Sequence, residues 1–378
     1  MGGLGGELSG VTAAELGVVA ARAALAEAGI ANVDEVVFGN VLSAGQGQAP
    51  ARQIALGAGL PESAVATTIN KMCGSGMKAA MMAYDGLMAG NIDMALIGGT
   101  ESMSNAPYLM PRVREGLRMG HAEVKDHMFL DGLEDVYEKG ALMGVFAERC
   151  ASDYQFTREA QDEYAIASLD RALAAQVNGT LAREIAPVDV VRQRDSVRID
   201  SDEQPRNAKR DKIASLRPVF AKDGTVTAAN ASSISDGAAA MVLTRASVAE
   251  AKGLQPIATM TGHASHGMTP DNFPIAPIGA VEKLLERTGT TLGDYGLFEV
   301  NEAFAVVALA AIRSLGLPHE ATNVHGGACA LGHPIGASGA RIMVSLLNAM
   351  RAHDVKRGLA TICIGGGEAT AVALELME

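Results

Sequence analysis

Residues 66–80 read Ala-Thr-Thr-Ile-Asn-Lys-Met-Cys-Gly-Ser-Gly-Met-Lys-Ala-Ala, and the rest of the chain is organised around them. The β-branched run that ends at Ile69 predicts a strand, and the helix formers up to about Met88 predict a helix. Cys73 lies at the turn between them, where flanking glycines allow a tight bend. A thiol near a helix N-terminus is favoured as thiolate, so Cys73 is a candidate nucleophile. The alternative is an inert core cysteine.

Length and composition indicate an α/β protein of roughly two to three domain-sized units. The chain has 378 residues, of which 48% are hydrophobic and 4% aromatic, and 43 are glycines. Its net charge of −12 argues against nucleic acid or an anionic membrane as the main partner. No apolar run is long enough to span a membrane, and no secretory signal is visible, so we expect a cytoplasmic protein.

The four cysteines, Cys73, Cys150, Cys329 and Cys363, are too few in so long a chain to form a disulfide framework. We therefore expect a reducing compartment. The sequence has no Cys-x-x-Cys pair and no histidine-rich cluster. We therefore expect no metal site.

The middle of the chain differs in texture from its two ends. Residues 105–222 carry 18 of the 31 Lys and Arg residues, and residues 157–178 predict a helix that begins after Thr157 and stops at Gly179. We interpret residues 105–224 as an inserted loop domain. Residues 1–104 and 225–249 then form an N-terminal half, and residues 250–378 form a C-terminal half.

The two halves share a sequence echo. The segment Ile-Gly-Gly-Thr-Glu at residues 97–101 matches Ile-Gly-Gly-Gly-Glu at residues 364–368, and each follows an apolar strand. A glycine-rich turn that enters a small-residue helix precedes each segment, with Cys73 in one turn and His333 in the other. Two similar βα halves would explain the echo and would place these two residues opposite one another.

Three further residues are candidates for chemistry. His333, in Gly-His-Pro, can take a proton from a thiol. Cys363, at a strand end beside flexible N–H groups, can act as an acid or base next to an oxyanion site. Asn301, in Asn-Glu-Ala-Phe, can hold a water or a ligand oxygen. Taken singly, each has a structural alternative: a helix-capping histidine, a core cysteine and a helix-capping asparagine.

Taken together, the cysteine turn, Asn-Glu-Ala-Phe, Gly-His-Pro and Cys-x-Gly-Gly-Gly resemble the thiolase family over nearly the whole chain. The resemblance implies two similar α/β halves in a five-layer α-β-α-β-α arrangement, with an inserted loop domain. It also implies reversible transfer of an acyl group between coenzyme A and an acyl-CoA carbon, by way of an acyl-cysteine.

The resemblance gives each site residue a role. Cys73 matches the nucleophile, and His333 matches its base and part of one oxyanion site, which a water on Asn301 completes. Cys363 matches the acid/base at the α-carbon. The N–H groups of Cys73 and Gly365 match a second oxyanion hole. No redox cofactor is required, because coenzyme A is substrate and product.

The resemblance also places coenzyme A along the loop domain. Ser232 matches a pantetheine contact, and Arg206 matches an arginine near the nucleotide end. A local positive patch around Arg206 would suit phosphates, although charge runs are more often solvated faces. Its other members are Lys209, Arg210, Lys212 and Arg217.

Several positions depart from the family pattern. Leu142 stands where many short-chain members carry a histidine, next to a retained Met143, and Phe273 replaces a methionine of the bacterial biosynthetic enzymes. These three residues line the acyl pocket by resemblance. His325 stands where asparagine is common, and Cys329 where an aliphatic residue is common. The strand with which family members usually begin would precede Met1, so we expect either that the sequence is truncated or that this strand is absent, which would weaken the sheet.

We therefore expect an acetyl-CoA C-acyltransferase that acts on short 3-ketoacyl-CoA such as acetoacetyl-CoA, as a homodimer or homotetramer. One alternative is a degradative 3-ketoacyl-CoA thiolase of fatty-acid β-oxidation with broader chain length. The alternative of another class is a catalytically silent acyl-CoA or lipid-binding relative, which the presence of all four catalytic positions disfavours.

Overall fold

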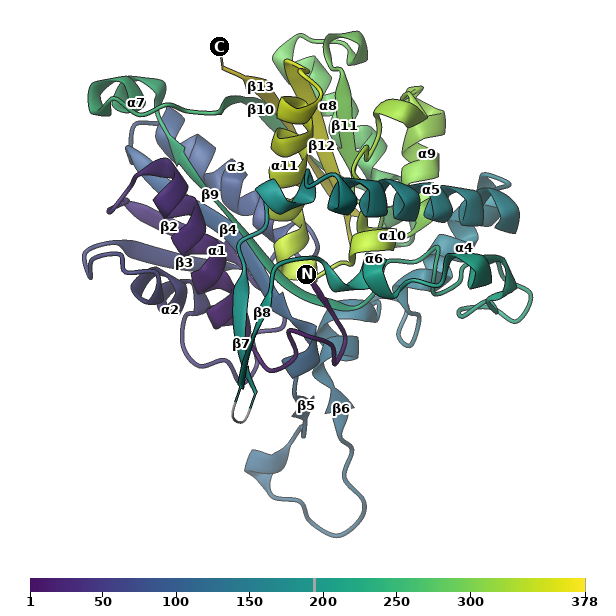
Figure 1. Ribbon diagram of the computed structural model, residues 1–378. Coiled ribbons are helices and arrows are strands. Elements are labelled where there is room, and N and C mark those ends of the chain that lie inside the picture. Colours follow the sequence, from purple (N-terminus) through teal and green to yellow (C-terminus); the bar gives the residue numbers. More distant parts are fainter. Residues whose placement is uncertain (193–194, 378) are drawn as a thin grey trace.

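The computed structural model describes residues 1–192 and 195–377 and contains two large mixed sheets (Figure 1). The first sheet has the strand order β1-β9-β4-β2-β3, and the second has the order β10-β13-β12-β11. The strands of the first sheet are β1 Gly2–Gly3, β2 Glu35–Gly39, β3 Val65–Ile69, β4 Met94–Ser102 and β9 Ser235–Thr244. Those of the second are β10 Ala258–Gly267, β11 Leu297–Val300, β12 Arg357–Ile364 and β13 Glu368–Leu376.

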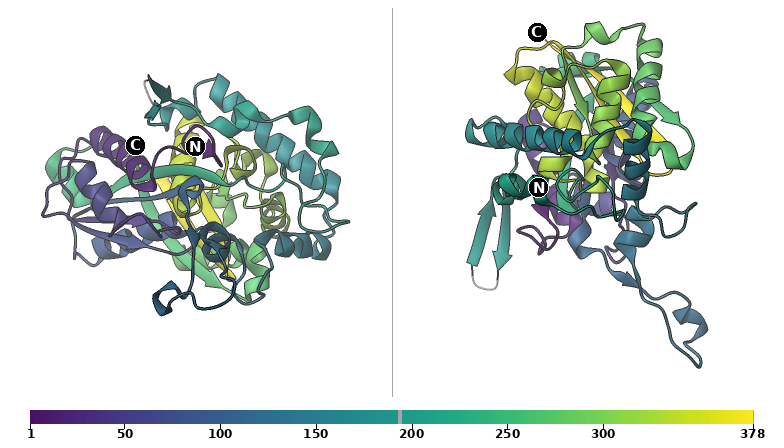
Figure 2. Two further views of the ribbon diagram at one scale, coloured as in Figure 1. Left: turned by 90° about the horizontal axis from the view of Figure 1, so that it is seen from below. Right: turned by 90° about the vertical axis from the view of Figure 1, so that its right-hand side faces the viewer.

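Helices cover both sheets and separate them, which gives five layers (Figures 1 and 2). Helices α1 and α2 cover the outer face of the first sheet, α3 and α11 lie between the sheets, and α8 and α9 cover the second. Their bounds are α1 Ala13–Ala28, α2 Pro50–Gly57, α3 Ser75–Met88, α8 Ala276–Thr288, α9 Ala305–Leu315 and α11 Ile335–Ala352. The predicted α-β-α-β-α arrangement is confirmed.

The expected elements form where local sequence signals are strong. Thr12 caps α1 in a capping box with Glu15, and Gly29 ends that helix in a left-handed conformation. Strand β3 ends at Ile69 and α3 runs to Met88, as the sequence predicts.

The two central helices approach one another through glycine. A Cβ atom on Gly76 of α3 would lie 2.6 Å from the backbone nitrogen of Ala340, and one on Gly339 of α11 would lie 2.5 Å from that of Met77. Such contacts exclude any side chain at either glycine. Because α3 begins just after Cys73 and α11 just after His333, this contact places the two candidate catalytic turns side by side.

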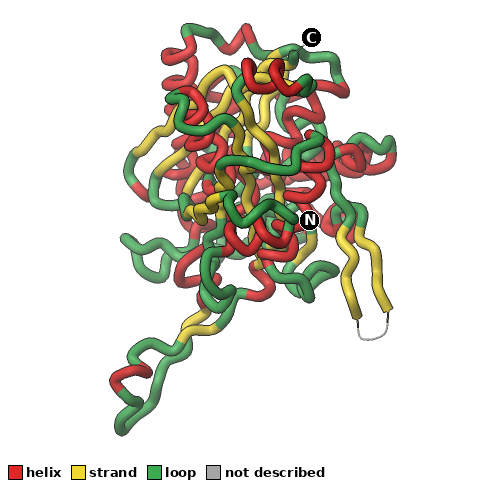
Figure 3. The backbone as a smooth tube through the Cα atoms, turned by 90° about the vertical axis from the view of Figure 1, so that its left-hand side faces the viewer, coloured by secondary structure: helices red, strands yellow, loops and turns green. Residues whose placement is uncertain are grey.

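The segment between β4 and β9 carries its own elements. Helix α5, Arg158–Val177, begins after Thr157 as predicted. The other elements here are β5 Tyr108–Leu109, β6 Lys125–Asp126, α4 Met143–Asp153, β7 Val188–Arg192, β8 Asp195–Ile199 and α6 Glu203–Asn207. The part that contains β5 and β6 extends away from the body of the molecule as a long arm (Figure 3).

Shorter elements complete the chain. Helix α7 Ala246–Lys252 follows β9, and α10 Ala328–Leu331 precedes His333. The 3₁₀ and π turns are η1 Met103–Asn105, η2 Val113–Glu115, η3 Phe129–Leu133, η4 Leu181–Arg183, η5 Arg210–Ser215, η6 Pro270–Ile275, η7 Leu292–Asp294 and η8 His319–Ala321. Among the residues described, none of these helices has the length and apolar character needed to cross a membrane.

The two sheets differ at one edge. Strand β10 pairs with β13 from Ala258 to Gly267, whereas β1 pairs with β9 only through Gly2 and Gly3. A groove of about 1190 Å³ runs along the rest of β9, with Leu16 of α1 and Met343 of α11 among its apolar lining residues.

Candidate active site

The turn that carries Cys73 is strained and tightly fastened. Met72 adopts a φ of 47°, in the left-handed region that side chains rarely occupy. The hydroxyl of Ser75 accepts a hydrogen bond from the Lys71 N–H at 2.8 Å and donates one to the Met72 carbonyl at 2.6 Å. This fastening holds Cys73 at the start of α3.

The Cys73 thiol is neutral in the free protein. Burial raises its pKa to about 11, although the N–H groups of Gly365 and of Cys73 itself act to lower it, and the charge of Glu101 adds to the rise. The helix N-terminus alone favours a thiolate, but desolvation outweighs it here. The two N–H groups that face the sulfur are those predicted to form an oxyanion hole.

His333 presents one ring nitrogen for proton transfer. The Ser338 hydroxyl donates to the Pro334 carbonyl at 3.0 Å, and it therefore accepts from His333 Nδ1–H at 2.6 Å. This arrangement leaves Nε2 unprotonated, and Nε2 is buried without a hydrogen-bond partner among the residues described. Burial lowers the pKa of His333 to about 3, and the charge of Arg341 acts in the same direction. The imidazole is therefore neutral and able to accept a proton.

The second thiol lies within electrostatic range of the first. Cys363 is the penultimate residue of β12 and is only 1% exposed. Burial raises its pKa well above the usual value, and the proximity of Cys73 raises it further. Gly365 opens the three-residue turn into β13, and a Cβ atom there would lie 3.3 Å from the Met143 sulfur.

Asn301 follows β11 and is held by its backbone and its side chain. Its N–H donates to the Thr361 carbonyl at 3.0 Å, and its Oδ1 accepts from Arg341 at 3.4 Å. Because Oδ1 faces Arg341, Nδ2 remains for another acceptor, and it has none among the residues described. An amide held in this way can donate to a bound water.

Two of the predicted acyl-pocket residues belong to the apolar cluster that contains Cys363. Phe273 is 3% exposed, its ring packs edge-on against Phe146 at a centroid distance of 6.2 Å, and Met143 packs against the same cluster. Leu142 immediately precedes α4 but does not belong to this cluster.

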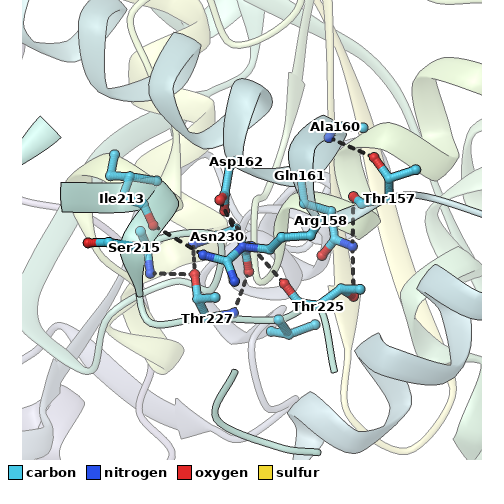
Figure 4. A network of polar contacts seen from close by, with 12 residues as sticks. Thr157, Arg158, Ala160, Gln161, Asp162, Ile213, Ser215, Thr225, Thr227 and Asn230 are labelled. Carbon is cyan, nitrogen blue, oxygen red and sulfur yellow. Dashed lines mark hydrogen bonds and ion pairs between the residues drawn. The ribbon is translucent and has the colours of Figure 1, made fainter. Parts of the chain in front are cut away.

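Ser232 lies in a stretch that the inserted segment holds in place. Its N–H donates to the carbonyl of Ala303, two residues after Asn301, at 2.9 Å. Figure 4 shows the network that supports this stretch: Asn230 Nδ2 donates to Asp162 Oδ1 at 2.9 Å, and Asp162 accepts from Arg158 at 2.8 Å. Helix α5 thus fixes the backbone from which Ser232 projects.

The predicted positive patch is partly neutralised. Arg206 forms an ion pair with Glu7 at 2.6 Å, and Arg210 forms a bidentate pair with Asp170 at 2.7 and 2.8 Å. The patch therefore offers phosphates less free charge than the sequence indicates. Its remaining exposed cations are Lys209, Lys212 and Arg217.

The two remaining departures from the family pattern are Cys329 and His325. The Cys329 sulfur lies 3.6 Å from the Asn230 carbonyl and 3.8 Å from that of Glu302, where it fills space behind the Asn301 loop. The His325 ring packs against that of His353 at 5.4 Å. Within the described part of the chain, no three His, Cys, Asp or Glu side chains are arranged to hold a metal ion.

Sequence reasoning missed four residues that shape this site. Ser338, Arg341, Glu101 and Glu302 are all buried beside the catalytic candidates. Ser338 follows His333 by five residues, so its place in the first turn of the next helix was a usable signal. Glu302 follows Asn301 directly in the Asn-Glu-Ala-Phe motif, so its position was also a usable signal. Arg341 and Glu101 come close only through folding.

Comparison with known proteins settles the family. The family model for the thiolase N-terminal domain matches residues 1–247, and that for the thiolase C-terminal domain matches residues 254–376. The chain belongs to the thiolase family. An acetyl-CoA acetyltransferase of Cupriavidus necator is 48% identical over 99% of this chain and 96% of its own length. Acetyl-CoA acetyltransferase 1 of Arabidopsis thaliana is 50% identical over 99% of this chain and 91% of its own.

Solved thiolase structures agree with this assignment. The Acat5 thiolase of Ascaris suum, crystallised in complex with coenzyme A, superposes with a TM-score of 0.94 and is 41% identical. That match covers all of this chain and 97% of the Ascaris chain. The predicted family and the predicted thiolase fold are therefore both confirmed.

Proposed function

We propose that the protein is an acetyl-CoA C-acyltransferase that catalyses the reversible Claisen condensation and thiolysis of short 3-ketoacyl-CoA such as acetoacetyl-CoA. The observation that carries the proposal is the meeting of two thiols, Cys73 and Cys363, beside the Gly365 N–H. Membership of the thiolase family makes the chain an acyltransferase. Relatives along its whole length are named for acetyl-CoA acetyltransferase activity, which supports the short substrate.

The first half-reaction is acyl transfer to Cys73. Its sulfur attacks the thioester carbonyl while His333 Nε2 accepts the thiol proton. Because both groups are neutral in the free protein, proton transfer accompanies the attack and does not precede it. The N–H groups of Cys73 and Gly365 receive the charge that develops on the carbonyl oxygen. Coenzyme A leaves with a proton, and the acyl-cysteine remains.

The second half-reaction forms or breaks the carbon–carbon bond. Cys363 passes its proton to His333 Nε2 and, as the thiolate, removes the α-proton of a second acetyl-CoA. The His333 Nε2–H and a water held by Asn301 Nδ2 then donate to the enolate oxygen. The enolate carbon attacks the acyl-cysteine carbonyl, which releases acetoacetyl-CoA and the Cys73 thiolate, and His333 Nε2–H returns the proton to the Cys73 sulfur. Thiolysis follows the same steps in reverse. These steps use coenzyme A as substrate and product and require no further cofactor.

The acyl pocket supports a short chain. Phe273 packs edge-on against Phe146 in the apolar cluster that includes Cys363, and the two rings are proposed to limit the length of the acyl chain. Leu142 and Met143 complete the proposed pocket wall. A degradative enzyme of broader chain length would need more room at this place.

Coenzyme A is proposed to lie along the inserted segment, residues 105–224, with its pantetheine arm at Ser232. Arg206, which forms an ion pair with Glu7, is proposed to lie near the nucleotide end of coenzyme A. The crystal structure of the Ascaris thiolase in complex with coenzyme A supports the proposal that this chain binds coenzyme A. The halves on either side of the segment are proposed to be residues 1–104 with 225–249, and 250–378.

The protein is also proposed to act as a homodimer or homotetramer in the cytoplasm. The arm beyond η1 exposes large apolar side chains, which are costly to leave in water and common at interfaces between subunits. These are Tyr108, Met110, Val113, Leu117 and Met119.

The experiment that tests the function combines labelling with turnover. Incubation with [¹⁴C]acetyl-CoA should add one acetyl group to the peptide that contains Cys73, and acetoacetyl-CoA with coenzyme A should yield acetyl-CoA. Assays with longer 3-ketoacyl-CoA should show lower rates, and assays with 2-methyl-branched 3-ketoacyl-CoA measure whether the pocket also admits a branch. Absence of a label on Cys73 in protein that consumes no acetoacetyl-CoA would exclude the proposal.

A further inference from the structure

Two buried carboxylates lie beside the site, and no step of the proposed reaction uses them. Glu101, near the end of β4, and Glu302, directly after Asn301, are both 0% exposed. The hydrogen bonds that they accept come from backbone N–H groups and uncharged side chains. A buried carboxylate costs free energy unless its oxygens are satisfied, so such placement needs a reason.

Glu302 joins three segments that are distant in sequence. Its Oε1 accepts from the Tyr164 hydroxyl at 2.9 Å and from Asn323 Nδ2 at 2.8 Å. Its Oε2 accepts from the Ser168 hydroxyl at 2.8 Å and from the Cys329 N–H at 3.0 Å. The carboxylate therefore ties the Asn301 loop to α5 and to the chain that leads into His333.

Glu101 makes an equivalent connection on the other side. Its Oε2 accepts from the N–H groups of Val41 and Gly336 at 3.0 and 2.9 Å. Its Oε1 accepts from the Leu42 N–H at 3.1 Å and from Asn40 Nδ2 at 2.9 Å. The first turn of α11, which follows His333 directly, is thereby fastened to the loop after β2.

We propose that Glu101 and Glu302 are positioning residues that hold the His333 turn, residues 327–338, from its two ends. Cys329 lies four residues before His333 and Gly336 three residues after it. Between them, the His333 N–H donates to the Ser233 carbonyl at 3.1 Å. The turn is thus held at three points, and the imidazole between the outer two stays aligned with Cys73.

The chain leaves room for both carboxylates. A Cβ atom on Gly327 would lie 2.3 Å from the Glu302 carboxyl carbon, and one on Gly336 would lie 2.7 Å from Glu101 Oε2. Any larger residue would push the carboxylate away from the N–H group that it holds. Close contact of each carboxylate with the His333 turn is therefore built into the sequence at both ends.

This proposal rests on the assignment of His333 as the base in the proposed function. Replacement of either glutamate by glutamine exchanges one acceptor oxygen for an amide N–H₂. This group then faces donors that cannot act as acceptors, such as the backbone N–H of Cys329. The turn then shifts, and a misplacement of about 1 Å can cost about 10²-fold in rate. Substrate contacts are untouched, so KM should change little.

The test compares Glu302→Gln and Glu101→Gln with Glu184→Gln, which alters a carboxylate that holds Ser345 and Asn348 further along α11. We expect the kcat of acetoacetyl-CoA thiolysis to fall at least about tenfold in the first two variants, with KM within about threefold. The Glu184 variant should stay within about twofold of the parent. Wild-type kcat in folded Glu302→Gln and Glu101→Gln would overturn the proposal.

A readout without substrate separates this proposal from the proposed function. Iodoacetamide should alkylate Cys73 more slowly in Glu302→Gln than in the parent, as measured by peptide mass spectrometry, because the base is displaced. If the parent protein shows no thiolysis but alkylation is still slower in Glu302→Gln, the positioning role of Glu302 is supported and the proposed function is rejected. If Glu302→Gln does not fold, the double variant Tyr164→Phe, Ser168→Ala removes two donors to the carboxylate, and parental kcat and alkylation in it would overturn the proposal.

Discussion

The same strand connection is made in two very different ways in the two halves. Strands β4 and β9 are antiparallel neighbours in one sheet, as β12 and β13 are in the other. Residues 103–234 join the first pair, whereas only residues 365–367 join the second. The short turn brings the Gly365 N–H to Cys73, and the long segment brings α5 and Ser232. One connection is therefore proposed to serve the chemistry and the other to serve coenzyme A.

The largest expected effect would abolish both half-reactions at once. Cys73→Ala removes the only atom that carries the acyl group, and we expect acetyl exchange and thiolysis each to fall by at least about 10⁴-fold. Radiolabel exchange between acetyl-CoA and coenzyme A measures the first half-reaction, and absorbance of acetoacetyl-CoA measures thiolysis. Cys329→Ala is the control and should keep both. Retained thiolysis in Cys73→Ala would place the nucleophile elsewhere.

The next variant distinguishes the two thiols. Cys363→Ala removes the proposed acid/base, which lies just before the short turn of residues 365–367. Thiolysis should therefore fall by about 10²–10⁴-fold, the usual range for a general acid or base. Acetyl exchange through Cys73 should stay within about tenfold of the parent. Cys150→Ala, another buried cysteine of the same apolar cluster, should leave both intact. Equal losses of exchange and thiolysis in Cys363→Ala would contradict the division of roles.

A smaller effect is expected from the long connection. Asn230→Ala removes the side chain that links Asp162 and Thr225, and the loss of buried hydrogen bonds should lower the free energy of unfolding by about 1–3 kcal/mol. The stretch before Ser232 should loosen, which raises KM for coenzyme A several-fold while kcat stays within about threefold. Asn207→Ala on exposed α6 is the control. A selective fall in kcat would instead assign this segment to the chemistry.

The smallest effect concerns a buried acid of the second sheet. Glu299 is the penultimate residue of β11 in the second sheet. The penultimate residue of β2 in the first sheet is the apolar Phe38. Burial raises the pKa of Glu299 to about 8, with Arg341 opposing the rise. The folded state therefore keeps a proton that the unfolded state releases above about pH 4.5, so stability falls as the pH rises from there to about 8.

Glu299→Gln should remove the contribution of Glu299 to the decrease in the free energy of unfolding with pH. That contribution has a slope of at most about 1.4 kcal/mol per pH unit. Urea unfolding at pH 5, 6, 7 and 8 measures the difference, with Glu250→Gln, an exposed residue of α7, as the control. Parallel pH profiles for the parent and Glu299→Gln would show that Glu299 is ionised throughout the range.

The fold was largely predictable because its signals are local. Thr12 and Gly29 mark the ends of α1, and the cysteine turn marks the start of α3. The Gly-Gly echo does not mark matching strand ends, because Gly98 and Gly99 lie inside β4 whereas Gly365 and Gly366 lie in the turn after β12. Catalytic candidates were found for the same reason: each lies in a short motif. The roles of Glu302 and Arg341 could not be predicted, since a buried charged group acquires its partners only when distant segments meet.

Electrostatic detail was the least predictable part. The helix N-terminus favours a Cys73 thiolate, but the amount of protein around the sulfur decides the pKa, and no stretch of sequence reports it. Likewise, Arg206 and Arg210 form a basic run in the sequence, yet Glu7 and Asp170 approach them from other parts of the chain.

The glycine contact between α3 and α11 has a consequence for how such an enzyme diversifies. Any side chain added at Gly76 or Gly339 moves both helices, and with them Cys73 and His333 together. Change at the centre is therefore all-or-none, whereas a change at Leu142 or Phe273 of the proposed acyl pocket leaves the contact between α3 and α11 in place.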